Sequence, residues 1–513
     1  MALALPSSDP SPLVPGLYAT DAFHRQPLFE VEHQVVRSWE EAHALHGSAR
    51  LEDVNPAYVA ALITGHHSAT AAPYRRIRRL PRAHHVHVAH DGSIHVSPFD
   101  PLAGGAGPMA EEDLHAFLRQ GLLDHVDAAL AGHSGPIGCE HSSGLDSNAV
   151  LGALRHGLGI AAEQIHTWSN ENGGEREPLQ QFRPFHQLLS ENCISSNILE
   201  AKGRHDAATV HQQQLKVFGA PAQIGGLPWP LKLFQERGCT VLFSGFGGDQ
   251  AISHNASNVP TDLVAQGRWR DLVQWVGGRR RAVKTVGERM LALRSRTWAE
   301  ARVLRRSRDF ARSDLLIAAL TEEGRNWLQP DLKRSYPWEI DSLLRQHDSI
   351  RHRVLADWVA VRSEEETRLA SAHGIHKAFP LLDERSIGTL LHQDPSVFGE
   401  GSGRGRLVHR RAFAPFLPPV LRDNPKKDRL TEADIGPWRQ ALLESRRQEL
   451  MNSFEQRPDW HPQVQRFWRL DAINRSVRDV AEASQPDLKD VMGVTRAITT
   501  LRSIDHWFRA LEG

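Results

Sequence analysis

His141-Ser142-Ser143-Gly144-Leu145-Asp146-Ser147 follows directly on the apolar residues Pro136-Ile137-Gly138-Cys139. This pattern predicts a strand that ends in a loop of small residues, then a helix with an apolar stripe that stops near Gly157. Such a loop directs several backbone N–H groups and hydroxyls at one point beside the positive end of a helix dipole, which suits a pyrophosphate. In this interpretation Asp146 holds the metal ion that bridges the phosphates.

A second loop of similar composition follows the apolar stretch Thr240-Val241-Leu242-Phe243. It reads Ser244-Gly245-Phe246-Gly247-Gly248-Asp249-Gln250, and Asp249 would supply the second carboxylate of a clamp for Mg²⁺ and pyrophosphate. Each loop alone could be an ordinary strand-to-helix turn. An ordered pair about 100 residues apart argues against that alternative.

The two loops resemble the pyrophosphate-binding loops of the asparagine synthetase superfamily, whose members adenylate a carboxylate and then form an amide. Ser143 replaces the first glycine of the family's Ser-Gly-Gly-Leu-Asp-Ser loop, and Gln250 replaces a glutamate that follows the second aspartate. The resemblance implies ATP and Mg²⁺ as cofactors, with Asp146 and Asp249 on the metal. The ATP-binding residues that it implies are Ser142, Ser143, Gly144, Leu145, Asp146, Ser147, Ser244, Gly245, Gly247 and Gly248.

Two later segments extend the resemblance. Gly374–Asp383 is similar to the family's Gly-Ile-Glu-x-Arg-x-Pro-Phe-Leu-Asp segment, although His376 and Ala378 replace its two charged residues. We expect Pro380 and Asp383 to be structural, because they would cap and orient the next helix.

The segment from Leu421 to Asp428 resembles the late lysine loop of the family. By its spacing from Pro425, Lys426 is favoured over Lys427 as the catalytic lysine. It would neutralise charge that develops on the phosphate and the tetrahedral carbon. Asp249 would be the other catalytic residue, through the metal that it holds. The other lysine would then belong to a solvated charge run.

Phe246 stands where asparagine synthetases carry a glutamate, and β-lactam synthetases a tyrosine, that is concerned with deprotonating the amine. Phenylalanine accepts no proton, so the base comes from elsewhere or from the substrate and its phosphate. In lasso-peptide macrolactam cyclases, which resemble this superfamily, the position varies and can be aromatic.

The segment from about residue 15 to 100 alternates in the manner of β-strands. Its stretch Tyr74–His84 resembles the end of the glutaminase domain of asparagine synthetases, which carry a cysteine directly after the initiator methionine. This sequence has Ala2 there, and its first cysteine is Cys139. We therefore expect a truncated, inactive glutaminase-like domain over residues 1–105, a linker within 102–108, and an ATP-binding ligase domain over residues 110–513.

Beyond the linker, strand-like stretches alternate with helical patterns, and the chain reads mostly helical from about residue 260. The alternation predicts the α/β class, with a doubly wound parallel sheet and a largely helical C-terminal part. The ligand would bind at the carboxyl ends of the strands.

Composition excludes several classes of partner. The 61 basic residues equal the 61 acidic residues, so net charge predicts no affinity for nucleic acid or anionic membranes. No apolar run is long enough to span a bilayer, and three widely spaced cysteines form no disulfide framework. A reducing cytoplasm is the simplest compartment.

Two other clusters have ordinary explanations. His84, His85, His87 and His90 fall on a predicted strand whose alternation separates them, so a surface strand is favoured over a zinc site. The basic stretch 279–312 could receive an acidic peptide or a partner protein, but a solvated helix face is the favoured reading.

These features together predict an ATP-dependent, AMP-forming carboxylate-amine ligase. The resemblance favours a lasso-peptide cyclase that joins an N-terminal amine to an Asp or Glu side chain of a precursor peptide, beside a leader peptidase and a leader-binding protein. Three alternatives stay open. They are an ammonia-using asparagine synthase, a small-molecule cyclase of the β-lactam synthetase type, and a non-catalytic scaffold that binds peptide.

Overall fold

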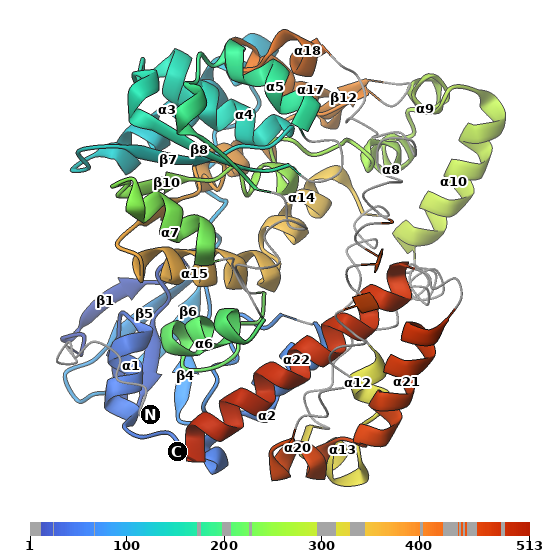
Figure 1. Ribbon diagram of the computed structural model, residues 1–513. Helices are drawn as coiled ribbons and strands as arrows, with labels where there is room; N and C mark the ends of the chain where they lie inside the picture. The colour runs from blue at the N-terminus through green and yellow to red at the C-terminus, as the bar shows by residue number, and fades with distance from the viewer. Residues whose placement is uncertain are drawn as a thin grey trace.

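The computed structural model describes most of the chain (Figure 1). The described residues are 12–23, 25–65, 67–171, 176–196, 207–224, 228–294, 314–328, 344–400, 404–423, 440, 443–444, 447–448, 459–483 and 488–512.

A parallel five-stranded sheet organises the larger part of the molecule. Its strand order is β11-β10-β7-β8-β9, and its strands are β7 (Ile137–Glu140), β8 (Ile165–Asn170), β9 (Cys193–Ser196), β10 (Val241–Phe243) and β11 (His376–Ala378). The chain steps outward from β7 to β9 and then returns to the other side of β7. This topology places a switch point between β7 and β10, where ligands bind in doubly wound sheets. The predicted α/β class with a parallel sheet is confirmed.

Helices cover both faces of this sheet (Figure 1). One face carries α3 (Glu111–Leu130), α4 (Leu145–Gly152) and α5 (Arg176–Phe185), and the other carries α7 (Pro228–Glu236) and α15 (Asp357–Ser371). Side chains of β10 alternate between the two layers: Phe243 joins the core beneath α3 and α4, whereas Leu242 packs with Phe234 of α7. The period of two along a strand therefore fills both cores.

The N-terminal segment forms two three-stranded antiparallel sheets, of order β1-β5-β6 and β3-β2-β4. The strands are β1 (Gly16–Ala19), β2 (Phe29–Val31), β3 (Gln34–Val36), β4 (Ile77–Arg79), β5 (His84–Val88) and β6 (Ile94–Pro98). The expectation of β-type alternation omitted two helices here, α1 (Trp39–His46) and α2 (Pro56–Thr64). Ser38 and Glu41 form a capping box at the start of α1, which explains why that helix interrupts the strands.

The C-terminal helices pack on this N-terminal segment rather than on the parallel sheet. One hydrophobic core joins Trp39 and Tyr74 to Trp507 and Phe508 of the long helix α22 (Leu488–Glu512), which crosses the lower half of the molecule in Figure 1. The division near residues 105–110 stays a prediction. Gly105 of the expected linker packs against Gly388 of α16 (Glu384–Leu390).

Most of the remaining elements are helices, and all of these except α6 and the start of α8 lie beyond residue 260, where the chain was expected to be mostly helical. They are α6 (Ala207–Phe218), α8 (Val259–Ala265), α9 (Trp269–Val276), α10 (Arg279–Arg294), α12 (Asp314–Ala318), α13 (Glu322–Leu328), α14 (Gln346–Val354), α17 (Leu407–Ala412), α18 (Pro419–Asp423), α20 (Pro462–Phe467) and α21 (Leu470–Glu482), with a short hairpin of β12 (Gly399–Glu400) and β13 (Arg404–Gly405). Among the described helices, none is long and apolar enough to cross a membrane.

Candidate active site

The first predicted loop connects β7 to α4 at the carboxyl edge of the sheet. The hydroxyls of Ser142 and Ser147 lie 2.9 Å apart, and Ser142 Oγ also accepts a 3.1 Å hydrogen bond from the N–H of Gly144. These two serines shape the loop through bonds within it. The predicted strand, loop and helix are all present, and the helical run extends through a π-helical turn to Gly157.

Asn148, which the sequence patterns did not single out, holds this loop through hydrogen bonds from its side chain. Its amide Nδ2 donates to the carbonyls of Ser142 and Gly144, at 2.9 and 2.8 Å. Its Oδ1 lies 3.3 Å from His141 Nε2 and 3.0 Å from His186 Nε2. Burial lowers the pKa of His141 to about 4 and that of His186 well below its usual value, so both rings are neutral at pH 7.

The second predicted loop follows β10 and lies directly against the first. A Cβ atom added at Gly245 would fall 2.6 Å from the backbone nitrogen of Ser147, and one at Gly248 would fall 2.2 Å from Asp146 Oδ1. Gly247 has a positive φ of 103°, a conformation that glycine adopts without strain. The glycines are therefore required for the close approach of the two loops.

This approach brings the two predicted aspartates together. Ser253 Oγ donates 3.0 Å to Asp146 Oδ2 and lies 3.5 Å from Asp249 Oδ1. Two basic residues one helical turn apart also reach the site: Arg406 Nη2 lies 2.7 Å from Asp249 Oδ1, and His409 Nε2 lies 3.1 Å from Asp146 Oδ1. Neither basic residue was identified from the sequence, where they lie in an unremarked basic segment.

Electrostatics keep the first aspartate ionised. Burial acts to raise the pKa of Asp146, but contact with His409 and the charges of His409 and Arg406 outweigh it, so the pKa is lowered. Arg406 has a positive φ of 65° and stands immediately before α17. A non-glycine residue in this conformation is uncommon outside sites where the surrounding structure enforces it.

The arrangement fits a divalent cation that is shared with a bound nucleotide. Asp146 Oδ1 is buried, and its 3.1 Å contact with His409 lacks the geometry of a hydrogen bond. Both carboxylates converge on Ser253. In the described part of the chain, no group of three or more His, Cys, Asp or Glu side chains has an arrangement that could hold a metal ion by itself. Asp146 and Asp249 would therefore hold Mg²⁺ with phosphate oxygens and water as its other ligands, as is usual for this ion.

If the chain adenylates its substrate as the sequence predicts, we expect Gly248→Ala to lower that rate about a hundredfold, the usual cost of a displacement near 1 Å in an active site. The new methyl group would occupy the place of Asp146 Oδ1 and displace that carboxylate. The measurement is ATP-pyrophosphate exchange. Gly104→Ala is the matched control, because its Cβ would meet nothing within 4 Å, and equal rates for the two variants would contradict the geometry.

A chain of buried charges lies under the second loop. Lys377 of β11 contacts Glu140 at the end of β7 (2.6 Å) and Glu366 of α15 (2.7 Å). Glu140 in turn accepts a 2.6 Å hydrogen bond from the hydroxyl of Ser244. Burial acts to lower the pKa of Lys377, but the two glutamates outweigh it and raise the pKa, so the lysine is a cation and not a base.

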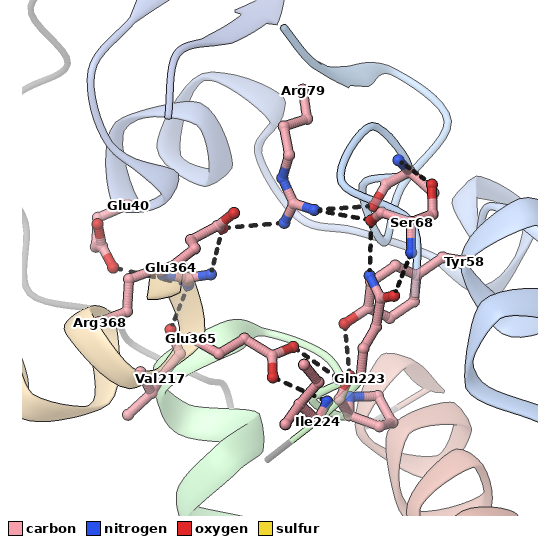
Figure 2. A network of polar contacts seen from close by, with 12 residues as sticks. Glu40, Tyr58, Ser68, Arg79, Val217, Gln223, Ile224, Glu364, Glu365 and Arg368 are labelled. Atoms are coloured by element: carbon pink, nitrogen blue, oxygen red, sulfur yellow. Dashed lines mark hydrogen bonds and ion pairs between the residues drawn. The ribbon is translucent and has the colours of Figure 1, made fainter. Parts of the chain in front are cut away.

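Helix α15 connects this site to the N-terminal sheets through consecutive glutamates. Figure 2 shows the first two: Glu364 pairs with Arg79 of β4 at 3.0 Å, and Glu365 accepts from the backbone N–H groups of Gln223 and Ile224 at 2.7 and 3.0 Å. The third, Glu366, contacts Lys377. A buried ion pair whose partner is removed costs several kcal/mol, so α15 is held firmly between the two parts.

A cavity of about 1600 Å³ lies between the N-terminal segment and the parallel sheet. Its wall includes Arg25, Trp39, Lys216, His376 and Phe379. The two glycine-rich loops do not line it, but Phe379 also contacts the ring of Phe246 in the second loop. This cavity therefore borders the candidate site from one side.

The other predicted residues have mixed outcomes. Asp383 caps α16 as expected, because its carboxylate accepts from the N–H groups of Arg385 and Ser386. Lys426 and Lys427 lie outside the described residues. In the stretch 279–312, Arg279–Arg281 are exposed on α10, and residues 295–312 are also outside the described part.

A parallel sheet with two glycine-rich acidic loops at its switch point defines a doubly wound α/β protein with a site suited to a phosphate-bearing ligand. Comparison with protein families is more specific: residues 118–509 match the family described as asparagine synthase. The chain belongs to this family, whose members are ATP-dependent ligases that form C–N bonds. No curated protein matches the sequence.

Proposed function

We propose that this protein is an AMP-forming carboxylate-amine ligase that closes a peptide into a macrolactam. The observation that supports the ligase chemistry is the convergence of Asp146 and Asp249 across the switch point. Mg²⁺, when bound there, would neutralise the phosphates and favour departure of pyrophosphate. The loop amides and Arg406 would surround the departing charge.

The reaction has two steps. A carboxylate oxygen of the substrate attacks the α-phosphorus of ATP, and the bond to pyrophosphate breaks. The amine then attacks the acyl carbon, loses a proton, and AMP leaves with the electron pair of the acyl-oxygen bond. Phe246 supplies no proton acceptor at the second step.

Two features support a peptide substrate. The adjoining cavity of about 1600 Å³ exceeds the usual size of a small-molecule pocket, roughly 300–1000 Å³. Phe246, Trp358 and Phe379 form an apolar cluster beside the second loop, whereas ammonia would be bound by polar groups. A lasso-peptide precursor, delivered by a leader peptidase and a leader-binding protein, is the substrate that we propose.

The test is ATP turnover with linear peptides that carry a free N-terminal amine and one Asp or Glu side chain. We expect AMP and pyrophosphate, together with a peptide product that has lost one water. Turnover with free aspartate and ammonia alone would assign an asparagine synthase, and turnover with small amino acids alone would assign a small-molecule cyclase. ADP as the product, or no turnover with any acid, would contradict the proposal.

A further inference from the structure

The ring of Phe246 has a cation on one face. The guanidinium of Arg362, on α15, lies 4.1 Å from the ring centre. Trp358 and Phe379 contact the same ring edge to face. A guanidinium at this distance from an aromatic face is attracted by the π electrons and keeps a fixed orientation.

A second contact fixes the rotation of this guanidinium. Arg362 Nε donates to Glu366 Oε1 at 2.6 Å. Within the described part of the chain, Nη1 and Nη2 have no hydrogen-bond partner, and 36% of the side chain is exposed. The two outer nitrogens are thus held in place with their donors available.

The buried charges below hold Glu366 in turn. Lys377 bonds both Glu366 and Glu140, and Glu140 bonds Ser244 of the second loop. Arg362 is the partly exposed end of this chain, and its orientation is tied to the loop that carries Asp249. A planar guanidinium with two available donors matches the geometry of a carboxylate.

We propose that Arg362 binds the carboxylate of the acyl substrate and that Phe246 serves as the platform that orients it. This inference rests on the proposed ligase function and names a residue that selects its acyl substrate. The guanidinium stays protonated at any working pH, so it holds the carboxylate and takes no part in proton transfer. Phe246 at the position of a base is then explained by a binding role.

The experiment measures binding and turnover separately. The α-carboxamides of N-acetyl-L-aspartate and N-acetyl-L-glutamate, each with one side-chain carboxylate, are titrated by saturation-transfer NMR without ATP. The α-carboxamide of N-acetyl-L-asparagine is the uncharged probe. We expect the acids to bind and Arg362→Met to weaken them by about 10- to 100-fold, the range for a charge-assisted bidentate pair. Arg362→Lys should recover only part of this loss, because an ammonium lacks the planar fork.

Arg385→Met is the matched control. Arg385 is an exposed arginine of α16, and its guanidinium lies 5.1 Å from the centre of the Phe117 ring. In turnover assays, Arg362→Met should raise the KM of the acyl peptide while the KM of ATP changes less than about threefold, since the proposed contact of Arg362 is with the acyl substrate and not with ATP. Thermal unfolding of each variant checks that the fold persists. Equal binding of acids by wild type and a folded Arg362→Met would overturn the proposal.

The outcome is separable from that of the ligase assignment. If the wild-type protein binds the acids but makes no AMP, and Arg362→Met no longer binds them, the carboxylate site is supported and only the ligase reaction is rejected. If the wild-type protein forms AMP and Arg362→Met leaves the KM of the acyl peptide unchanged, the ligase reaction is supported and the carboxylate site is rejected.

Discussion

Asp146→Asn is expected to reduce ATP-pyrophosphate exchange by about a thousandfold, at the upper end of losses for a group that stabilises charge directly. The amide keeps the shape of the side chain but removes the negative charge that faces His409 and would hold Mg²⁺. Asp249, paired with Arg406, would then be the one carboxylate left of the two. The measurement is exchange at saturating ATP with an acyl substrate that supports wild-type turnover.

Asp91→Asn is the control for this prediction. Asp91 lies in the exposed turn between β5 and β6 and accepts a hydrogen bond from the N–H of Ser93, so the same chemical change occurs far from the site. We expect it to leave exchange within about twofold of wild type, as is usual for surface substitutions. If a folded Asp146→Asn variant exchanges at more than about one third of the wild-type rate, Asp146 does not hold the metal ion.

Lys377→Met is expected to destabilise the fold by about 3–5 kcal/mol at pH 7, the usual cost of removing one partner from a buried charge cluster. Methionine fills the space, but Glu140 and Glu366 lose the cation between them. Urea unfolding at pH 7 measures the loss. Lys232→Met, at an exposed lysine of α7 whose side chain is 69% exposed, should change stability by less than about 0.5 kcal/mol.

The pH dependence of the stability tests whether the loss in Lys377→Met comes from charge. Burial acts to raise the pKa of Glu366, but Lys377 and Arg362 outweigh it and lower the pKa below the usual value of 4.5. In the wild type this carboxylate therefore stabilises the fold above that value, and the contribution is lost as the pH falls through the lowered pKa.

Without Lys377, the main influence that lowers the pKa is gone, and we expect the pKa of Glu366 to rise above 4.5. The folded variant then binds a proton more readily than the unfolded chain. The difference in the free energy of unfolding between wild type and Lys377→Met should therefore become smaller as the pH falls from 7 toward 5. Glu140→Gln combined with Glu366→Gln should restore part of the stability at pH 7, and a deficit independent of pH would contradict the charge argument.

Local patterns in the sequence were sufficient to predict the strands and the helix that position the site. The apolar strand before Ser142 and the one before Ser244 are confirmed, as are the helix after the first loop and the cap formed by Asp383. Each depends on neighbours within a few residues, because backbone hydrogen bonds and side-chain periodicity act over one or two turns. The lysine loop around Lys426 stays a prediction.

The sequence by itself therefore determined the parallel α/β sheet, the two acidic loops and, through its resemblance, the family. Only the tertiary structure decided which charges meet there. Arg406 and His409 reach the aspartates from more than a hundred residues away, and Lys377 joins Glu140 to Glu366 across three elements. Ion pairs of this kind depend on how helices pack on the sheet, and no local spacing encodes them.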